Sequence, residues 1–375
     1  MPAKRSDVAF TTWVGVLLFA GAGVMAMVLV AAGAPRAIGI GVVLAALPVG
    51  PLIAVYLWLD RYEPEPRSLL LLGLGWGAFV ATSAALFLQA FDAFAFGSTE
   101  AVQSTVVAPF TEEAAKGLFV LLLLFFRRAE LDGILDGIVY AGMVGIGFAF
   151  MENILYLSQA YIGTGNHVGS IEDAVSLFVI RGVFSPFAHP FFTAFFGVGV
   201  GIAVSTRSRV LQVAAPFGGY LLAVAAHASW NAGMLLDGGR GAAGTYILLM
   251  VPAFLAFACL AVWARRREGV LLATALTDCA RRGYLDAAEV PWLARIPGRR
   301  ACRAFARRQG GAEALQAMRG YQSAAVELGF LHHRYLRGTA PRNYAELGQE
   351  YVLRLAALRP QLIWPRNTRT VGVAG

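Results

Sequence analysis

ILDGIVYAGMVGIGFAFMENILYL, residues 134–157, is largely apolar over a length that crosses a bilayer. A transmembrane helix needs about 20 consecutive apolar residues to span a hydrocarbon core of roughly 30 Å. Runs of this kind recur along the chain, which is 58% hydrophobic and only 14% charged. With three cysteines as well, this composition excludes a disordered chain, a disulfide scaffold and most soluble enzymes. It predicts an all-α fold, a polytopic membrane helix bundle.

Eight apolar runs predict about eight transmembrane helices. Positive residues stay on the cytoplasmic side of a membrane, so their distribution over the loops gives the orientation. With the N-terminus inside, the inner segments carry Lys4, Arg5, Arg61, Arg67, Arg127, Arg128, Arg207, Arg209, Arg265, Arg266 and Arg267, and the outer ones Arg36, Arg181 and Arg240. The expected spans are residues 12–32, 37–59, 68–96, 106–126, 134–157, 182–204, 213–236 and 245–264.

Arginine is far commoner than lysine, and alanine and glycine are abundant, which indicates a GC-rich bacterial genome. We therefore expect a multi-pass protein of the inner (plasma) membrane, with the N-terminus and the C-terminal domain in the cytoplasm. Only two lysines occur in the chain, Lys4 and Lys116, so a lysine within a predicted span is unlikely to be accidental.

The segment after Arg267 differs from the rest of the chain. Residues 268–375 hold 16 arginines and 8 acidic residues and so carry the whole formal net charge of +8. We expect a transmembrane domain at 1–267 and a small, basic, helical cytoplasmic domain at 268–375. Its charge favours membrane lipid as a partner, because each basic side chain near an anionic leaflet contributes about 1 kcal/mol. Nucleic acid is not an expected partner. The pair His332-His333 is interpreted as a solvated helix face.

Ionisable side chains lie inside four consecutive predicted spans. A charge near the bilayer centre costs about 2.5–3.5 kcal/mol on a translocon scale, so such residues are rare and usually functional. Helix pairing explains one isolated charge more readily than six such groups. They are Glu112, Glu113, Lys116, Glu152, His189 and His227.

These groups are expected at one depth. With a helical rise of 1.5 Å per residue and the predicted orientation, the carboxylates and imidazoles fall in the outer third of the bilayer. Glu112 and Lys116 are four residues apart on one helix face, which predicts an ion pair, and His227 and Asn231 have the same spacing.

The stretch SPFAHP, residues 185–190, places two prolines around His189. Proline removes a backbone donor and breaks or kinks a helix. Because non-helical backbone at this depth is tolerated only inside protein or beside water, we expect a wet cavity here. Carboxylates can activate water, and an imidazole or amide can stabilise an oxyanion. Alternatively, His189, His227 and Glu152 form a zinc-type ligand set.

Four motifs, taken in order, resemble those of the PrsW family of intramembrane proteases, which is distantly similar to the CAAX prenyl proteases. They are EEAAK (112–116), FAFMEN (148–153), SPFAHP (185–190) and HASWN (227–231), and DRYEPEP (60–66) is similar to the loop before the family's core. The resemblance covers about residues 40–240. It implies an intramembrane endopeptidase of glutamate or metallo type.

By motif, the paired glutamates would supply the general base, Glu152 and His189 would position water or a metal, and His227 and Asn231 would stabilise the oxyanion. The cofactor stays open, with zinc as the candidate. Some relatives cut an anti-sigma factor on its outer side, so the implied substrate is a single-span membrane protein cleaved near the extracytoplasmic side. An ion- or proton-coupled transporter using the same buried charges is the alternative. The implied catalytic residues are Glu112, Glu113, Glu152, His189, His227 and Asn231, with Lys116 as their ion-pair partner.

Overall fold

The structure is a computed structural model, and it describes residues 5–165, 167–236 and 241–365. Lys4 and Arg240, two of the charges used to orient the chain, lie outside these ranges. Within them the chain is helical apart from turns, connecting segments and one antiparallel hairpin, in which β1 (Gly163–Thr164) pairs with β2 (His167–Val168). The all-α prediction is confirmed.

The chain forms two compact units, which are described separately. The first comprises residues 1–60 and 65–261, and the second comprises residues 61–64 and 262–375. The boundary predicted after Arg267 falls inside a helix that runs without interruption from Val251 to Arg281.

In the described ranges, seven helical segments are long and apolar enough to cross a membrane, which confirms the polytopic prediction. The eighth predicted span is α7 (Ala108–Phe126), a helix that carries three charged residues and is not among the seven. The seven are built from α1 (Arg5–Ala31), α2 (Pro35–Ala46), α3 (Val49–Leu59), α4 (Arg67–Gly75), η1 (Trp76–Ala81), α5 (Thr82–Phe96), α8 (Ile134–Ile162), α9 (Ile171–Phe178), η4 (Val179–Phe184), α10 (Ala188–Ser205), α11 (Arg209–Leu235), α12 (Gly241–Thr245), η6 (Tyr246–Met250) and α13 (Val251–Arg281).

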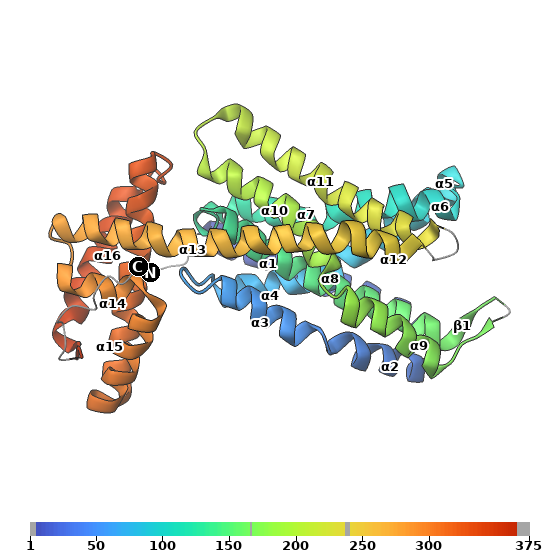
Figure 1. The fold of residues 1–375 in the computed structure, drawn as a ribbon, viewed down its shortest axis with the longest axis horizontal. Helices are drawn as coiled ribbons and strands as arrows, with labels where there is room; N and C mark the ends of the chain where they lie inside the picture. Colours follow the sequence, from blue (N-terminus) through green and yellow to red (C-terminus); the bar gives the residue numbers. More distant parts are fainter. Residues whose placement is uncertain (1–4, 166, 237–240, 366–375) are drawn as a thin grey trace. The chain divides into compact units, whose positions relative to one another are not determined.

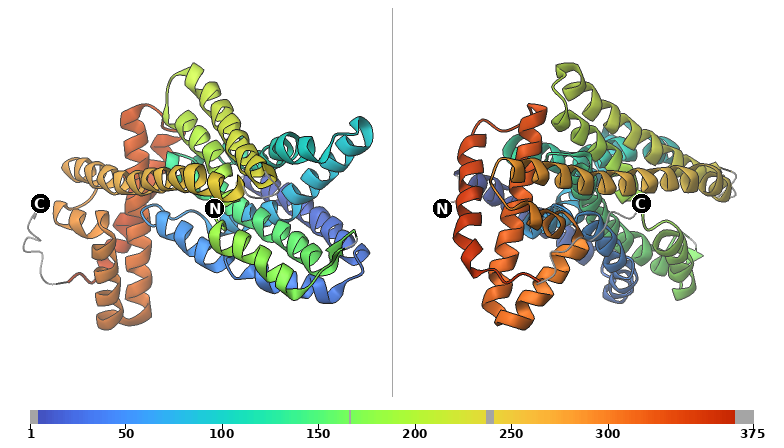
Figure 2. Two further views of the ribbon diagram at one scale, coloured as in Figure 1. Left: turned by 45° about the vertical axis from the view of Figure 1, so that its right-hand side comes forward. Right: turned by 60° about the vertical axis from the view of Figure 1, so that its left-hand side comes forward.

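Helix α8 is the central helix of the first unit, packed against α10, α2, η1, α4 and α3 (Figures 1 and 2). Its approach to α4 and η1 depends on glycine. A Cβ on Gly77 would lie 1.9 Å from the Val144 carbonyl oxygen, and one on Gly147 would lie 1.8 Å from the Leu74 carbonyl oxygen. Only hydrogen fits at either position, so the two backbones pack directly against each other.

The sixth membrane segment is longer than predicted and is interrupted. It begins at Ile171 rather than near residue 182, and passes through the π-helical turn η4. Residues 185–187 are not helical, and α10 starts at Ala188. The interruption expected around Pro186 is therefore present, and it places His189 in the first turn of a new helix.

Short helical turns complete the first unit. They are α6 (Glu100–Val102), η2 (Gln103–Val107) and η3 (Arg128–Glu130).

The second unit is a small helical bundle. Besides the end of α13, the second unit contains η7 (Ala287–Glu289), α14 (Val290–Ala294), α15 (Ile296–Arg337), α16 (Tyr344–Leu358) and η8 (Arg359–Gln361).

Buried apolar side chains of α13, α14, α15 and α16, including Leu276, Leu293 and Phe330, form the core of the second unit. The interpretation of His332 as a solvated residue is wrong. Its side chain is buried, and Nε2 lies 2.6 Å from Oδ2 of Asp278. The apolar neighbours on α15 turn this face inward, so the histidine is buried with a carboxylate partner.

Candidate metal and catalytic site

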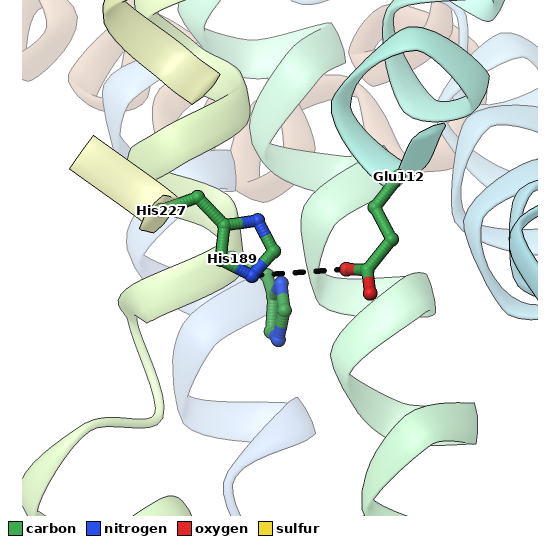
Figure 3. Close-up of side chains that lie close together, drawn as sticks. All are labelled: Glu112, His189 and His227. Carbon is green, nitrogen blue, oxygen red and sulfur yellow. Dashed lines mark ion pairs between the residues drawn. The ribbon is translucent and has the colours of Figure 1, made fainter. Parts of the chain in front are cut away.

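Four helices of the first unit bring the ionisable side chains into one cluster. They are α7, α8, α10 and α11. Each carboxylate and each imidazole of the cluster lies within hydrogen-bonding distance of at least one other member. Figure 3 shows three of the side chains pointing toward one another, Glu112 from α7, His189 from α10 and His227 from α11. The members of the cluster are Glu112, Glu113, Lys116, Glu152, His189 and His227.

Lys116 is fully buried and joins the two glutamates of its own helix. Its Nζ lies 3.3 Å from Oε2 of Glu112, as the spacing predicted, and only 2.7 Å from Oε1 of Glu113. The same nitrogen is 3.0 Å from Nδ1 of His189 and lies over the Phe148 ring, 3.9 Å from its centroid. One cation therefore faces two carboxylates, which offsets the cost of burying them.

Glu113 holds the ring of His227 in place. Its Oε1 lies 3.0 Å from Nδ1 of His227, while Oε2 accepts a hydrogen bond of 2.9 Å from the Thr193 hydroxyl. Phe192 stacks on the imidazole with the ring centroids 4.9 Å apart. The remaining ring nitrogen, Nε2, faces Glu112 at 3.8 Å from Oε2.

Glu152 holds the ring of His189 in the same way. Its Oε2 lies 2.7 Å from Nε2 of His189 and also pairs with Nη2 of Arg181. Arg181 in turn donates from Nε to the Asn153 side chain at 2.6 Å. From the sequence, Arg181 is predicted only as a charge of an outer segment. An arginine a few residues before the SPFAHP break is the signal that could have identified it as a partner of Glu152.

Two imidazoles and a carboxylate meet in a way that suits a divalent metal. The ligand-type atoms of Glu112, His189 and His227 all lie within 4.8 Å of one another, and the three side chains are buried. Such a set is typical of catalytic zinc sites. Imidazoles that bind metals usually give their other nitrogen to a carboxylate, and Glu113 and Glu152 occupy those positions here. The structure thus brings Glu112 to the two histidines, and Glu152, which the predicted ligand set contained, lies behind His189.

A cavity of about 400 Å³ in the first unit opens beside these groups. Asn231 lines it one helical turn beyond His227, and its Nδ2 donates to the Ser104 carbonyl at 2.9 Å. Gln89, on α5, donates to Oε1 of Glu112 at 3.3 Å. Glu113 is not among the described residues that line the cavity, whereas Glu112, Glu152, His189, His227, Asn231, Glu100 and Gln103 are.

The sequence profile of the PrsW family, described as intramembrane metalloproteases, matches residues 65–257. The chain belongs to the PrsW family. Every side chain of the buried cluster lies within the matched residues, whereas α14, α15 and α16 lie outside them.

The chain is also similar to curated PrsW proteins, each named Protease PrsW. It is 32% identical to the Geobacillus kaustophilus protein over 28% of this chain and 47% of that protein. It is 30% identical to the Bacillus subtilis protein over 31% and 53% of the two chains, and 29% identical to the Clostridioides difficile protein over 35% and 57%. The chain thus spans about half the length of these curated relatives. No solved structure matches it.

Proposed function

We propose that the chain is a metal-dependent intramembrane endopeptidase that hydrolyses a peptide bond of a membrane-anchored protein. The observation that carries the proposal is the buried set of Glu112, His189 and His227 on the wall of a cavity, with a carboxylate behind each imidazole. A hydrolase needs charged groups and water in one place. Because burying charged groups in a membrane is costly, their presence here favours a function that uses them.

Glu112, His189 and His227 are the residues that would hold the metal. When bound there, a divalent ion supplies a Lewis acid that polarises the scissile carbonyl and makes water a better nucleophile. Glu113 is a positioning residue, since it contacts His227 and Lys116 and does not line the cavity. Lys116 balances the charge of the two glutamates on its own helix.

We assign Glu152 as the general base. The hydrogen bonds described for Glu152, to His189 and Arg181, both use Oε2, which leaves Oε1 to accept a proton from the attacking water. Asn231 is assigned to the oxyanion. One N–H of its amide is used by the Ser104 carbonyl, and the second can donate to a substrate carbonyl that becomes negative in the transition state.

The position of the cavity supports cleavage near the extracytoplasmic side. Its wall includes Glu100 and Gln103, in the segment between α5 and α7, and Leu235 at the end of α11. The distribution of positive charge along the chain predicts that the opposite ends of these helices face the cytoplasm. A single-span substrate would then be cut in its outer juxtamembrane segment, and an anti-sigma factor is the candidate that the family resemblance offers. We propose with it that the chain lies in the inner (plasma) membrane with a cytoplasmic N-terminus.

The decisive experiment measures metal content and cleavage together. Purified full-length protein in liposomes, with a single-span reporter substrate, should contain close to one zinc or similar ion and lose activity on chelation. Glu112→Gln should lose both metal and activity. Glu152→Gln should lose about 10²–10⁴-fold in rate even when the metal is saturating, the usual contribution of a general base, and its metal affinity should fall no more than about 10–100-fold from loss of the carboxylate behind His189. Glu172→Gln, which removes an exposed carboxylate on α9, serves as the matched control.

Two results would overturn the proposal. One is full activity in Glu112→Gln, and the other is cleavage that persists after complete metal removal. The transporter alternative makes a different prediction: ion flux across the liposome that depends on the same carboxylates, with the reporter left intact.

The orientation has a separate test. In a background without Cys259, Cys279 and Cys302, a cysteine at Gly165 in the hairpin should react with a membrane-impermeant thiol reagent added outside cells. A cysteine at Ala129, between α7 and α8, should react only after the membrane is opened. The reverse pattern would place the cavity on the cytoplasmic side.

A further inference from the structure

A second pocket, in the second unit, is lined by an unusual concentration of arginine. It has a volume of about 450 Å³, and the remaining lining residues are Pro64, Ile296, Ala304 and Leu315. No aspartate or glutamate is among the described residues of its wall. The arginines that line it are Arg61, Arg299, Arg300, Arg303, Arg307 and Arg319.

Helical spacing accounts for the gathering of these side chains. Arg299, Arg303 and Arg307 follow one another at intervals of four residues, which places them on one face of α15. Like charges at this spacing destabilise a helix, so the pattern works against local stability. Beyond them α15 breaks at Gly310 and Gly311, where the backbone leaves helical geometry and φ of Gly311 is 67°. The break allows the later part of the helix to contribute Arg319 to the same pocket.

Arg299 is a buried arginine in the wall of this pocket. Its side chain is only 5% exposed. Nε donates to the Leu293 carbonyl at 2.5 Å and Nη1 to the Tyr62 carbonyl at 2.8 Å, but Nη2 is buried with no hydrogen-bond partner in the described structure. A buried donor without a hydrogen-bond partner destabilises the folded protein, and a charged donor does so more than a neutral one.

The electrostatics agree with this geometry. Burial, followed by the neighbouring charge of Arg303, lowers the pKa of the Arg299 guanidinium to about 10. The charges of Arg319 and Arg300 add to burial in lowering the pKa of Arg303. Tyr62 and then Glu63 favour the charged form of Arg299. Six arginines and no carboxylate among the described residues of its wall leave the pocket strongly positive, so a ligand that neutralises it must be an anion.

We propose that this pocket binds an anion through a phosphate group. The planar fork of an arginine matches two phosphate oxygens, and several arginines around one pocket can neutralise a phosphate that a single surface pair would not retain. The volume exceeds the need of one phosphate, so the pocket has room for further groups of a ligand. A water-soluble phosphate compound and a phospholipid headgroup share this chemistry. The proposal does not depend on the peptidase activity.

The test uses the full-length protein in phosphatidylcholine nanodiscs and two probes, inorganic pyrophosphate and short-chain phosphatidic acid. Binding of each probe is measured by calorimetry and by the rise in thermal unfolding temperature. Arg303→Gln with Arg319→Gln should weaken binding at least tenfold. Arg295→Gln with Arg308→Gln removes the same formal charge from exposed positions outside the pocket. This control pair should change the affinity for each probe less than twofold.

A second, adjacent pair of variants covers the case in which the first double variant fails to fold. Arg307 lines the pocket and Arg308 does not, and both are exposed, so Arg307→Gln should weaken binding and Arg308→Gln should not. Binding of pyrophosphate with this pattern identifies a soluble phosphate compound as the source, and binding of phosphatidic acid alone identifies the lipid. Equal effects of lining and control variants, or no binding of either probe, would overturn the proposal.

Discussion

Oε1 of Glu113 lies 3.0 Å from Nδ1 of His227, although the two residues are 114 positions apart in the chain. This contact joins the EEAAK motif of α7 to the HASWN motif of α11. It fixes which nitrogen of His227 faces the cavity side of the cluster. The second glutamate of the pair therefore contacts the histidine and is not among the described residues that line the cavity.

Replacing Glu113 by Gln should lower metal affinity and cleavage by about 10–100-fold, as loss of a carboxylate behind a metal-binding imidazole usually does. Thr193→Val removes only the hydrogen bond to the other carboxylate oxygen and should cost less than tenfold. Metal titration of the purified variants and cleavage rates measure both effects. Unchanged metal affinity in Glu113→Gln would show that the contact does not orient the ring.

Lys116→Met should destabilise the protein, because it leaves Glu112 and Glu113 buried without their shared cation. Removing one partner of a buried ion pair costs about 3–5 kcal/mol. Adding Glu113→Gln to Lys116→Met should recover part of this stability while activity stays low. A double-mutant cycle on unfolding in micelles gives the coupling energy directly. A cycle with no coupling would mean that the 2.7 Å contact contributes nothing to stability.

Gly77→Ala should destabilise the first unit by about 1–3 kcal/mol, the usual range for overpacking. The added carbon would lie 1.9 Å from the Val144 carbonyl oxygen, and the backbone of α8 would have to move. Gly39→Ala is the control, because Gly39 lies within α2 and a Cβ there meets no atom within 4 Å. Unfolding of both variants in the same detergent tests the difference. Equal stability would contradict the packing between η1 and α8.

Asp60 should make stability depend on pH. Burial raises its pKa to about 7, although its Oδ2 accepts a hydrogen bond from the Glu65 backbone N–H. The ordinary value in an unfolded chain is about 3.9. The folded state therefore binds the proton more tightly, and stability should fall as pH rises from about 4 to 7, by up to about 4 kcal/mol for a shift of this size.

Asp60→Asn keeps an acceptor for the Glu65 N–H and removes the titration. Thermal unfolding of the wild type and Asp60→Asn at pH 5 and pH 8 measures the effect. The gain in stability of the variant relative to the wild type should be larger at pH 8 than at pH 5, because the wild type loses stability progressively between about pH 4 and pH 7. A gain of equal size at both values would show that Asp60 does not titrate in this range.

Several features could be read from the sequence because they depend on local properties. The apolar runs, such as 134–157, have the length of the membrane, so they predicted the helices without knowledge of their neighbours. The pair Glu112 and Lys116 followed from helical spacing, and the break before His189 followed from the geometry of proline. Each prediction rested on a few adjacent residues.

Other features could not be predicted, because they depend on which helix face meets which. Motif order left Glu112 and Glu113 interchangeable, and packing of α7 against α11 decided that Glu113 contacts His227. In the same way, the approach of η4 to α8 gave Glu152 an arginine partner in Arg181.

The sequence by itself determined that the chain is a membrane helix bundle and which six ionisable side chains enter it, because hydropathy and helical rise act on each segment independently. Only the tertiary structure decided which glutamates line the cavity and which histidine each one contacts. Rotation of a helix by one residue turns a side chain by about 100°, enough to move a carboxylate from a cavity wall to the far side of a histidine. That rotation is set by contacts such as the one between Gly77 and Val144, which join segments far apart in the chain.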